Sequence, residues 1–144
     1  MSHKHGFYLE DLEIGMSDSL EKTISATDVA TFAALSGDNN PIHLDDEYAQ
    51  STVFGQRIVH GMFSAALISA VAGTKLPGAG GVYFSQELKF RKPIFIDDTV
   101  IATLTITDIN QRRGRVTMDT QVHVKGVLVV SGEAIYGVDK RPCE

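Results

Sequence analysis

Residues 60–73 read HGMFSAALISAVAG, a run in which every residue is apolar or small except His60, Ser64 and Ser69. A helix that is apolar on all sides is expected to be buried on all sides. The run is too short to span a bilayer, and the sequence KLPG at 75–78 ends it. These residues therefore predict a helix in the core of the protein, around which the rest of the chain must pack.

The chain after this helix shows the alternation of apolar and polar residues that is typical of β-strands. Strands are expected over residues 82–90, 100–107, 115–124 and 127–138, and one more begins near Met16. Arg113-Gly114 and Lys125-Gly126 are turn signals that join the later strands into antiparallel hairpins. Because each apolar face needs a partner, we expect an α+β fold in which an antiparallel sheet of about five strands wraps around the long central helix.

Length and composition are those of an ordinary soluble globular domain, with 43% hydrophobic and 22% charged residues. A chain of 144 residues predicts one domain over residues 1–144, large enough to bury a core. The net charge of -5 argues against nucleic acid as the main partner. The single cysteine, Cys143, cannot form an internal disulfide, and no signal peptide is visible, so a cytoplasmic location is expected.

Two ionisable residues precede the core helix. A short helix is expected to begin at Ser25 and to end at Gly37, just before Asp38. Pro41 stiffens the following loop, so the separation of Asp38 and His43 is constrained. A carboxylate and an imidazole held near each other can share one water molecule, which one group deprotonates while the other orients it. The alternative is that Asp38 caps local backbone amides and that His43 is a packed loop histidine.

Gly61 stands where the core helix begins. A residue without a side chain at this point lets a ligand oxygen approach N–H groups that have no partner within the helix, and the helix dipole would stabilise an enolate oxygen there. The alternative is that Gly61 only permits close packing. Ser64 and Ser69 are expected to return their hydroxyls to the carbonyl one turn back. Ser69 lies roughly 12 Å along the helix axis from Gly61, so any role of its own is supporting.

Other kinds of site have less support. His60 suits the start of a helix, and a metal site is not expected, because no second histidine stands at ligand spacing from His43. The neighbouring acids suit the first turn of a second short helix, which Asp45 can cap. Acyl transfer by a Ser-His-Asp triad would need a G-x-S-x-G elbow, which is missing. Two basic clusters could hold the phosphates of a nucleotide-bearing substrate or be solvated turns: Lys89, Arg91 and Lys92, and Arg112, Arg113 and Arg115.

The segment DNNPIHLD at 38–45, followed by FG at 54–55 and IVHGM at 58–62, closely resembles the hydratase-2 motif of the MaoC-like (R)-specific enoyl-CoA hydratases. The likeness continues through short matches over nearly the whole chain: LPG at 76–78, GVYF at 81–84, LKF at 88–90, PIF at 93–95 and GEA at 132–134. Members of that family have the hot-dog fold. The resemblance therefore implies a hot-dog fold here as well.

The resemblance also implies roles for single residues. Asp38 and His43 would activate the catalytic water, the amide of Gly61 would receive the thioester oxygen, and Ser69 would stand behind the acid. The implied reaction is the reversible syn addition of water to a trans-2-enoyl-CoA, giving an (R)-3-hydroxyacyl-CoA with no cofactor and no metal. The implied partners are an acyl-CoA thioester and a second copy of the chain in a homodimer, with no nucleic acid and no membrane.

Two competing functions remain open at the level of sequence. A hot-dog thioesterase also acts on acyl-CoA with a carboxylate near a helix N-terminus, but it would not require the sequence NPIH at 40–43. A non-catalytic acyl-CoA-binding or regulatory module could share the fold. The carrier likewise stays open between CoA and acyl carrier protein.

Overall fold

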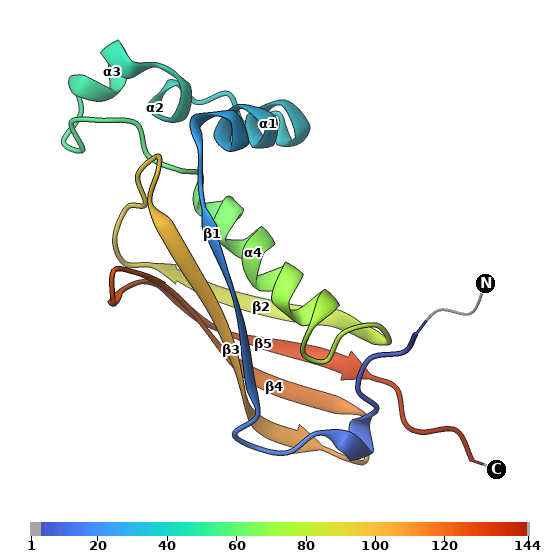
Figure 1. Cartoon of the computed structure of the whole chain (residues 1–144). Coiled ribbons are helices and arrows are strands. Elements are labelled where there is room, and N and C mark those ends of the chain that lie inside the picture. Colours follow the sequence, from blue (N-terminus) through green and yellow to red (C-terminus); the bar gives the residue numbers. More distant parts are fainter. Residues whose placement is uncertain (1–3, 144) are drawn as a thin grey trace.

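The computed structural model describes residues 4–143. An antiparallel sheet of five strands and one long helix form its body (Figure 1). In chain order the elements are η1 (Leu9–Asp11), β1 (Ser17–Thr23), α1 (Ala26–Ser36), α2 (Pro41–Leu44), α3 (Asp46–Gln50), α4 (Gly61–Thr74), β2 (Gly81–Phe90), β3 (Thr99–Asn110), β4 (Arg115–Val124) and β5 (Val127–Val138).

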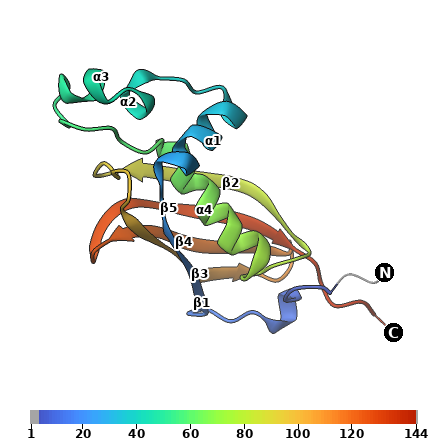
Figure 2. The same ribbon diagram turned by 45° about the horizontal axis from the view of Figure 1, so that its top comes forward.

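The strands lie in the order β1-β3-β4-β5-β2, so that β1 and β2 form the two edges of the sheet. All four neighbouring pairs are antiparallel. The sheet curves around α4, which lies along its inner face (Figures 1 and 2). The structure thus confirms the expected hot-dog arrangement of a sheet wrapped around a central helix.

Alternating side chains of the central strands build the core between sheet and helix. In β3 the apolar positions Val100, Ala102, Leu104 and Ile106 are at most 1% exposed. They face buried residues of α4, of which Ile68, Val71 and Ala72 are fully covered. This period of two, expected from the sequence, fixes which face of each strand meets the helix.

The expectation that the core helix is buried on all sides is wrong for the single chain. The sheet covers only one side of α4, where Phe63, Leu67 and Ile68 are buried. On the other side Met62 is 60% exposed, and the neighbouring positions are small. Among the described residues, no helix is long and apolar enough to cross a membrane.

The segment between β1 and α4 overhangs one end of the sheet and contains α1, α2 and α3 (Figure 1). The limits of α1 follow the expected signals: the Ser25 hydroxyl accepts the Asp28 N–H, and Gly37 ends the helix at a φ of 81°. Asp45 caps α3 by accepting the N–H of Tyr48 at 3.1 Å. The second short helix was therefore also expected correctly.

The one-turn helix α2 was not expected, because the sequence suggested a loop around Pro41. Asn40 is its N-cap, and the Asn40 side chain accepts the N–H of Ile42 at 3.1 Å. Pro41 occupies the first helical position, where its missing N–H has no intrahelical partner to lose. His43 consequently projects from a short helix and not from a loop.

Candidate active site

Asp38 lies directly after the αL residue that ends α1, on the exposed side of the overhanging segment. Its Oδ1 accepts the N–H of Asn40 at 3.2 Å. This is the local cap that the sequence offered as an alternative to chemistry. The cap engages one carboxylate oxygen only, so the carboxylate can make a further contact through the other one.

His43 is held by its backbone surroundings in one tautomer. Its side chain is buried, and Nδ1 donates to the carbonyl oxygen of Ile58 at 2.7 Å. Since a carbonyl oxygen only accepts, Nδ1 carries the hydrogen and Nε2 keeps its lone pair. Burial lowers the pKa of His43 below its usual value, and neighbouring His60 adds to this effect, whereas the Ile58 bond and the Asp38 carboxylate act against it.

His60 is the N-cap residue of α4, and its side chain is only 2% exposed. Nε2 donates to the backbone carbonyl of Asp38 at 3.0 Å. The ring stacks on that of His43 with centroids 3.8 Å apart and packs against Phe32 at 4.9 Å. The sequence suggested only a residue at the start of a helix, so this double contact with both members of the acid–imidazole pair was missed.

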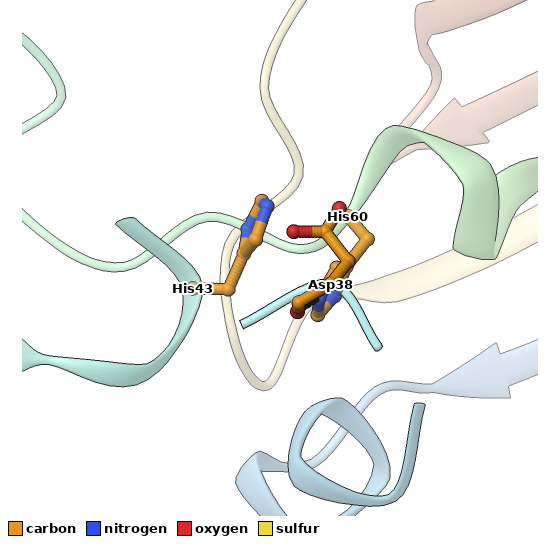
Figure 3. A group of neighbouring side chains, drawn as sticks. All are labelled: Asp38, His43 and His60. Carbon is orange, nitrogen blue, oxygen red and sulfur yellow. Dashed lines mark hydrogen bonds between the residues drawn. The ribbon is translucent and has the colours of Figure 1, made fainter. Parts of the chain in front are cut away.

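Asp38, His43 and His60 each place one carboxylate oxygen or ring nitrogen within 4.8 Å of the other two (Figure 3). Hydrogen bonds to water are about 2.8 Å long, so one water molecule can touch two groups up to about 5.6 Å apart. The separation of Asp38 and His43 therefore allows both to contact a single water. The one-turn helix α2, which Pro41 begins, and not the expected loop, sets the separation of Asp38 and His43.

Spacing along the sequence offered His43 no second histidine as a metal-ligand partner, but the chain folds back and brings His60 beside it. The ring geometry nevertheless fits a metal poorly. A ligated ion lies in the plane of the imidazole at about 2.0–2.1 Å from nitrogen. Two rings stacked at 25° to each other direct their in-plane lone pairs side by side and not toward one point. The cluster is better suited to holding water.

A cavity of about 390 Å³ opens at the start of α4. Its lining is mainly apolar, with two basic residues at one side: Phe54, Ile58, Val59, Gly61, Ser64, Phe90, Arg91, Lys92, Pro93, Ile94 and Val130. A Cβ on Gly61 would lie 2.9 Å from Cε1 of Phe90. A side chain here would therefore displace the Phe90 ring, which agrees with the interpretation that Gly61 permits close packing. Gly61 itself lines the cavity, and the first N–H groups of a helix have no partner one turn back, so a ligand oxygen can approach the helix here.

The two serines of α4 differ from what was expected. Ser64 is fully buried and lines the cavity, but its hydroxyl makes no hydrogen bond with any described residue. The expected bond to the carbonyl one turn back is therefore wrong for Ser64. Ser69 lines a different cavity, of about 500 Å³, between α4 and β2. Burial raises the pKa of Tyr136, and the neighbouring Ser69 hydroxyl acts against this rise.

The two basic clusters lie at opposite ends of β5. Arg91 and Lys92 line the cavity at Gly61, and the Arg91 Nε donates to the Ser131 hydroxyl at 2.7 Å. Arg115 pairs with Gly137 near the other end of the strand, where its guanidinium stacks on Phe84 at 3.8 Å. Only the first cluster is placed to meet a ligand that enters this cavity.

The start of the 14-residue helix α4 thus has two features: an acid–imidazole pair that contacts its N-cap residue His60, and a cavity lined by Gly61 and Ser64, to whose lining neither Asp38 nor His43 belongs. Such a helix end attracts developing negative charge on a ligand oxygen. The pair can remove a proton from water and return one to a nearby atom. Together these groups are equipped to move a water molecule onto or off a polarised double bond.

The similarity to known proteins extends over nearly the whole chain. Residues 12–127 match the family described as MaoC like domain. The chain is 51% identical over 134 residues to an (R)-specific enoyl-CoA hydratase of Rhodospirillum rubrum, covering 93% of each chain. It is 46% identical to a 3-hydroxybutyryl-CoA dehydratase of Methylorubrum extorquens, covering 93% of this chain and 85% of that one. Among solved structures, the unliganded R-hydratase PhaJ1 of Pseudomonas aeruginosa superposes with a TM-score of 0.89 at 39% identity, covering 94% and 88% of the two chains.

Proposed function

The chain belongs to the MaoC-like family, and on that premise we propose that it is an (R)-specific enoyl-CoA hydratase. The reaction is the reversible addition of water to a trans-2-enoyl-CoA to give an (R)-3-hydroxyacyl-CoA. The observation that carries this proposal is the approach of Asp38 and His43 within 4.8 Å of each other beside the start of α4. The names of the similar proteins agree with it.

In this proposal the thioester carbonyl lies in the cavity at Gly61, with its oxygen toward the first N–H groups of α4. Hydrogen bonds from these amides and the helix dipole stabilise the negative charge that develops on the oxygen as the enolate forms. Withdrawal of electrons toward the oxygen leaves C3 open to attack. The backbone thus supplies the electrophilic assistance.

The water is held between the two acceptors of the pair, the Asp38 carboxylate and Nε2 of His43. Asp38 removes one proton as the water oxygen bonds to C3, while Nε2 of His43 accepts a hydrogen bond from the O–H that stays intact and so orients the water. The proton then passes from the pair to C2, so that one water is consumed and no group is left changed. Both additions occur from the face that the pair occupies, which makes the addition syn. The product is (R) when the bound enoyl group turns the corresponding face of C3 toward the pair.

One assay distinguishes this function from its two competitors. The purified protein is mixed with crotonyl-CoA, and the enoyl absorbance and free thiol are followed together. Loss of absorbance without thiol release supports the hydratase. Thiol release would show a thioesterase, and no change in either signal would leave a binding module.

We further propose that two copies form a homodimer through the β2 edge. β2 pairs with β5 on one side only, and it presents exposed apolar side chains, with Val82 63%, Phe84 56% and Phe90 54% exposed. The open side of α4 with Met62 continues this surface across the cavity of about 500 Å³. Free strand edges and apolar patches of this kind are usually covered. Light scattering should give twice the chain mass of 15.6 kDa, and a clean 15.6 kDa species would refute the dimer.

Arg91 and Lys92 are the basic residues that we propose for the phosphates of the acyl carrier, since they line the cavity. The proposed reaction needs no cofactor. We also propose that the whole chain works as one hot-dog domain and that it acts in the cytoplasm.

A further inference from the structure

Ser64 is a buried polar residue that the mechanism above does not use. It is 0% exposed, and its hydroxyl is without a hydrogen-bond partner among the described residues. A buried hydroxyl that forms no hydrogen bond is costly, so such groups are usually paired. The helix around it is otherwise regular, and the hydroxyl has not taken the carbonyl one turn back that serines in helices commonly use. The free hydroxyl therefore calls for a partner from outside the chain.

The position of Ser64 on α4 indicates where that partner lies. Ser64 follows Gly61 by three residues, which places both on one face of the helix. Side chains of a helix lean toward its N-terminus, so the Ser64 side chain is directed back over the turn that Gly61 begins. Both residues line the same cavity of about 390 Å³. The hydroxyl and the free backbone N–H groups can therefore reach one ligand atom.

The other residues that line the cavity indicate which kind of ligand atom the Ser64 hydroxyl would bind. Apart from Arg91 and Lys92 at one side, the remaining lining residues have apolar side chains, among them Val59, Ile94 and Val130. A neutral hydroxyl in such surroundings, beside the positive end of a helix, is best matched by an acceptor oxygen that carries partial negative charge. In an acyl thioester the carbonyl oxygen is that acceptor.

We propose that the Ser64 hydroxyl donates a hydrogen bond to the thioester oxygen, as a second donor beside the Gly61 amide. The proposal rests on the hydratase function proposed above. The bond strengthens as the oxygen gains charge in the enolate, so Ser64 contributes mainly to the transition state. Ser64 is thereby a catalytic residue in addition to the acid–imidazole pair.

The test uses Ser64→Ala, Ser64→Thr and a matched control on the same helix. Thr74→Val removes a hydroxyl that donates to the Ala70 carbonyl at 2.6 Å, at the far end of α4 and outside this cavity. With crotonyl-CoA, Ser64→Ala should lower kcat/KM by about 100-fold, the lower range for loss of one oxyanion donor. Ser64→Thr keeps the hydroxyl and should recover most of the activity, and Thr74→Val should leave kcat/KM unchanged.

A binding comparison isolates the contact with the carbonyl oxygen. Butyryl-CoA has the thioester oxygen and no double bond, whereas the thioether S-butyl-CoA lacks that oxygen. Ser64→Ala should weaken butyryl-CoA about 2-fold to 13-fold, as expected for loss of one net hydrogen bond. It should leave the affinity for S-butyl-CoA unchanged. Equal weakening of both ligands, or of neither, would overturn the proposal.

Thermal unfolding separates this role from a structural one. Because the Ser64 hydroxyl bonds to no other described residue, Ser64→Ala should melt at the wild-type temperature or above it. A clearly lower melting temperature, or wild-type kcat/KM in a folded Ser64→Ala protein, would also refute the role. If the wild-type protein fails to hydrate crotonyl-CoA, the proposed function falls, whereas the comparison of butyryl-CoA with S-butyl-CoA still tests Ser64 by itself.

Discussion

Replacing His60 by phenylalanine should impair catalysis while leaving the fold intact. The substitution keeps an aromatic ring between Phe32 and His43, which contact His60 at centroid distances of 4.9 and 3.8 Å. It removes the donor that binds the Asp38 carbonyl at 3.0 Å. The substitution therefore removes the hydrogen bond that connects the backbone at Asp38 to the start of α4.

The size of the effect follows from that single bond. A net hydrogen bond contributes about 0.5–1.5 kcal/mol. If it favours the productive position of Asp38 by that amount, its loss lowers the population of that position, and with it kcat, by about 2-fold to 13-fold. Global stability should change little, because Nδ1 of His60 is buried without a hydrogen-bond partner among the described residues, and phenylalanine removes this unfavourable group at the same time.

The assay compares kcat and KM for crotonyl-CoA in His60→Phe, His60→Gln and the wild type, with melting temperatures as the control for folding. Glutamine can place its amide nitrogen near the position of Nε2, so His60→Gln should retain more of kcat than His60→Phe. It should be the less stable of the two, because the ring contacts are gone. A folded His60→Phe protein with the wild-type kcat would refute the positioning role.

Three further outcomes are expected. Asp38→Asn removes the base, so the rate of crotonyl-CoA hydration should fall about 100-fold to 10,000-fold. The melting temperature should not change, because the asparagine side chain still accepts the Asn40 N–H. Near wild-type turnover would exclude Asp38 as the base. Gly61→Ala places a Cβ 2.9 Å from Cε1 of Phe90, so the ring must shift, and the added methyl group narrows the space in which a ligand oxygen approaches the first N–H groups of α4. We expect kcat/KM to fall about 100-fold, the size expected for loss of one oxyanion contact; wild-type activity would leave Gly61 a packing role only. Burial lowers the pKa of His43 in the folded state, so the unfolded chain binds more protons than the folded chain as pH falls below the ordinary value of 6.5. Folding stability should therefore decrease over that range. Chemical denaturation at several pH values should show that this part of the decrease is absent in His43→Gln.

Local rules were sufficient for most of the elements. Alternation over Val100 to Ile106 identified β3 and its buried face, and the start and end of α1 followed from Ser25 and Gly37. These signals act between residues close in the chain, so the sequence displays them directly. The helix α2 was missed although Asn40 before Pro41 is itself such a signal, with a capping side chain followed by the residue favoured at the first helical position.

Contacts between distant residues account for what the sequence could not predict. Helix α3 and a loop separate His60 from His43 along the chain, and no periodicity or spacing rule predicts that the two rings stack. The exposed side of α4 depends on how far the sheet wraps, which the apolar composition of the helix does not reveal. The free hydroxyl of Ser64 is likewise visible only once its surroundings are known.

Contacts between the end of the overhanging segment, at Arg57 and Ile58, and its middle, at residues 42–46, explain how this segment can hold a precise site. Ile58 accepts Nδ1–H of His43 at 2.7 Å and donates its N–H to the Ile42 carbonyl at 3.2 Å, and Arg57 forms an ion pair with Asp46 at 2.9 Å. Closing a loop has an entropic cost that grows only slowly with its length, so a few such contacts can hold a segment of this size. In His43 and His60 one ring nitrogen is bound to a backbone carbonyl, so the backbone orients both imidazoles. The positions of the acid and the imidazole should therefore depend more on these carbonyl contacts than on the apolar packing of the overhanging segment.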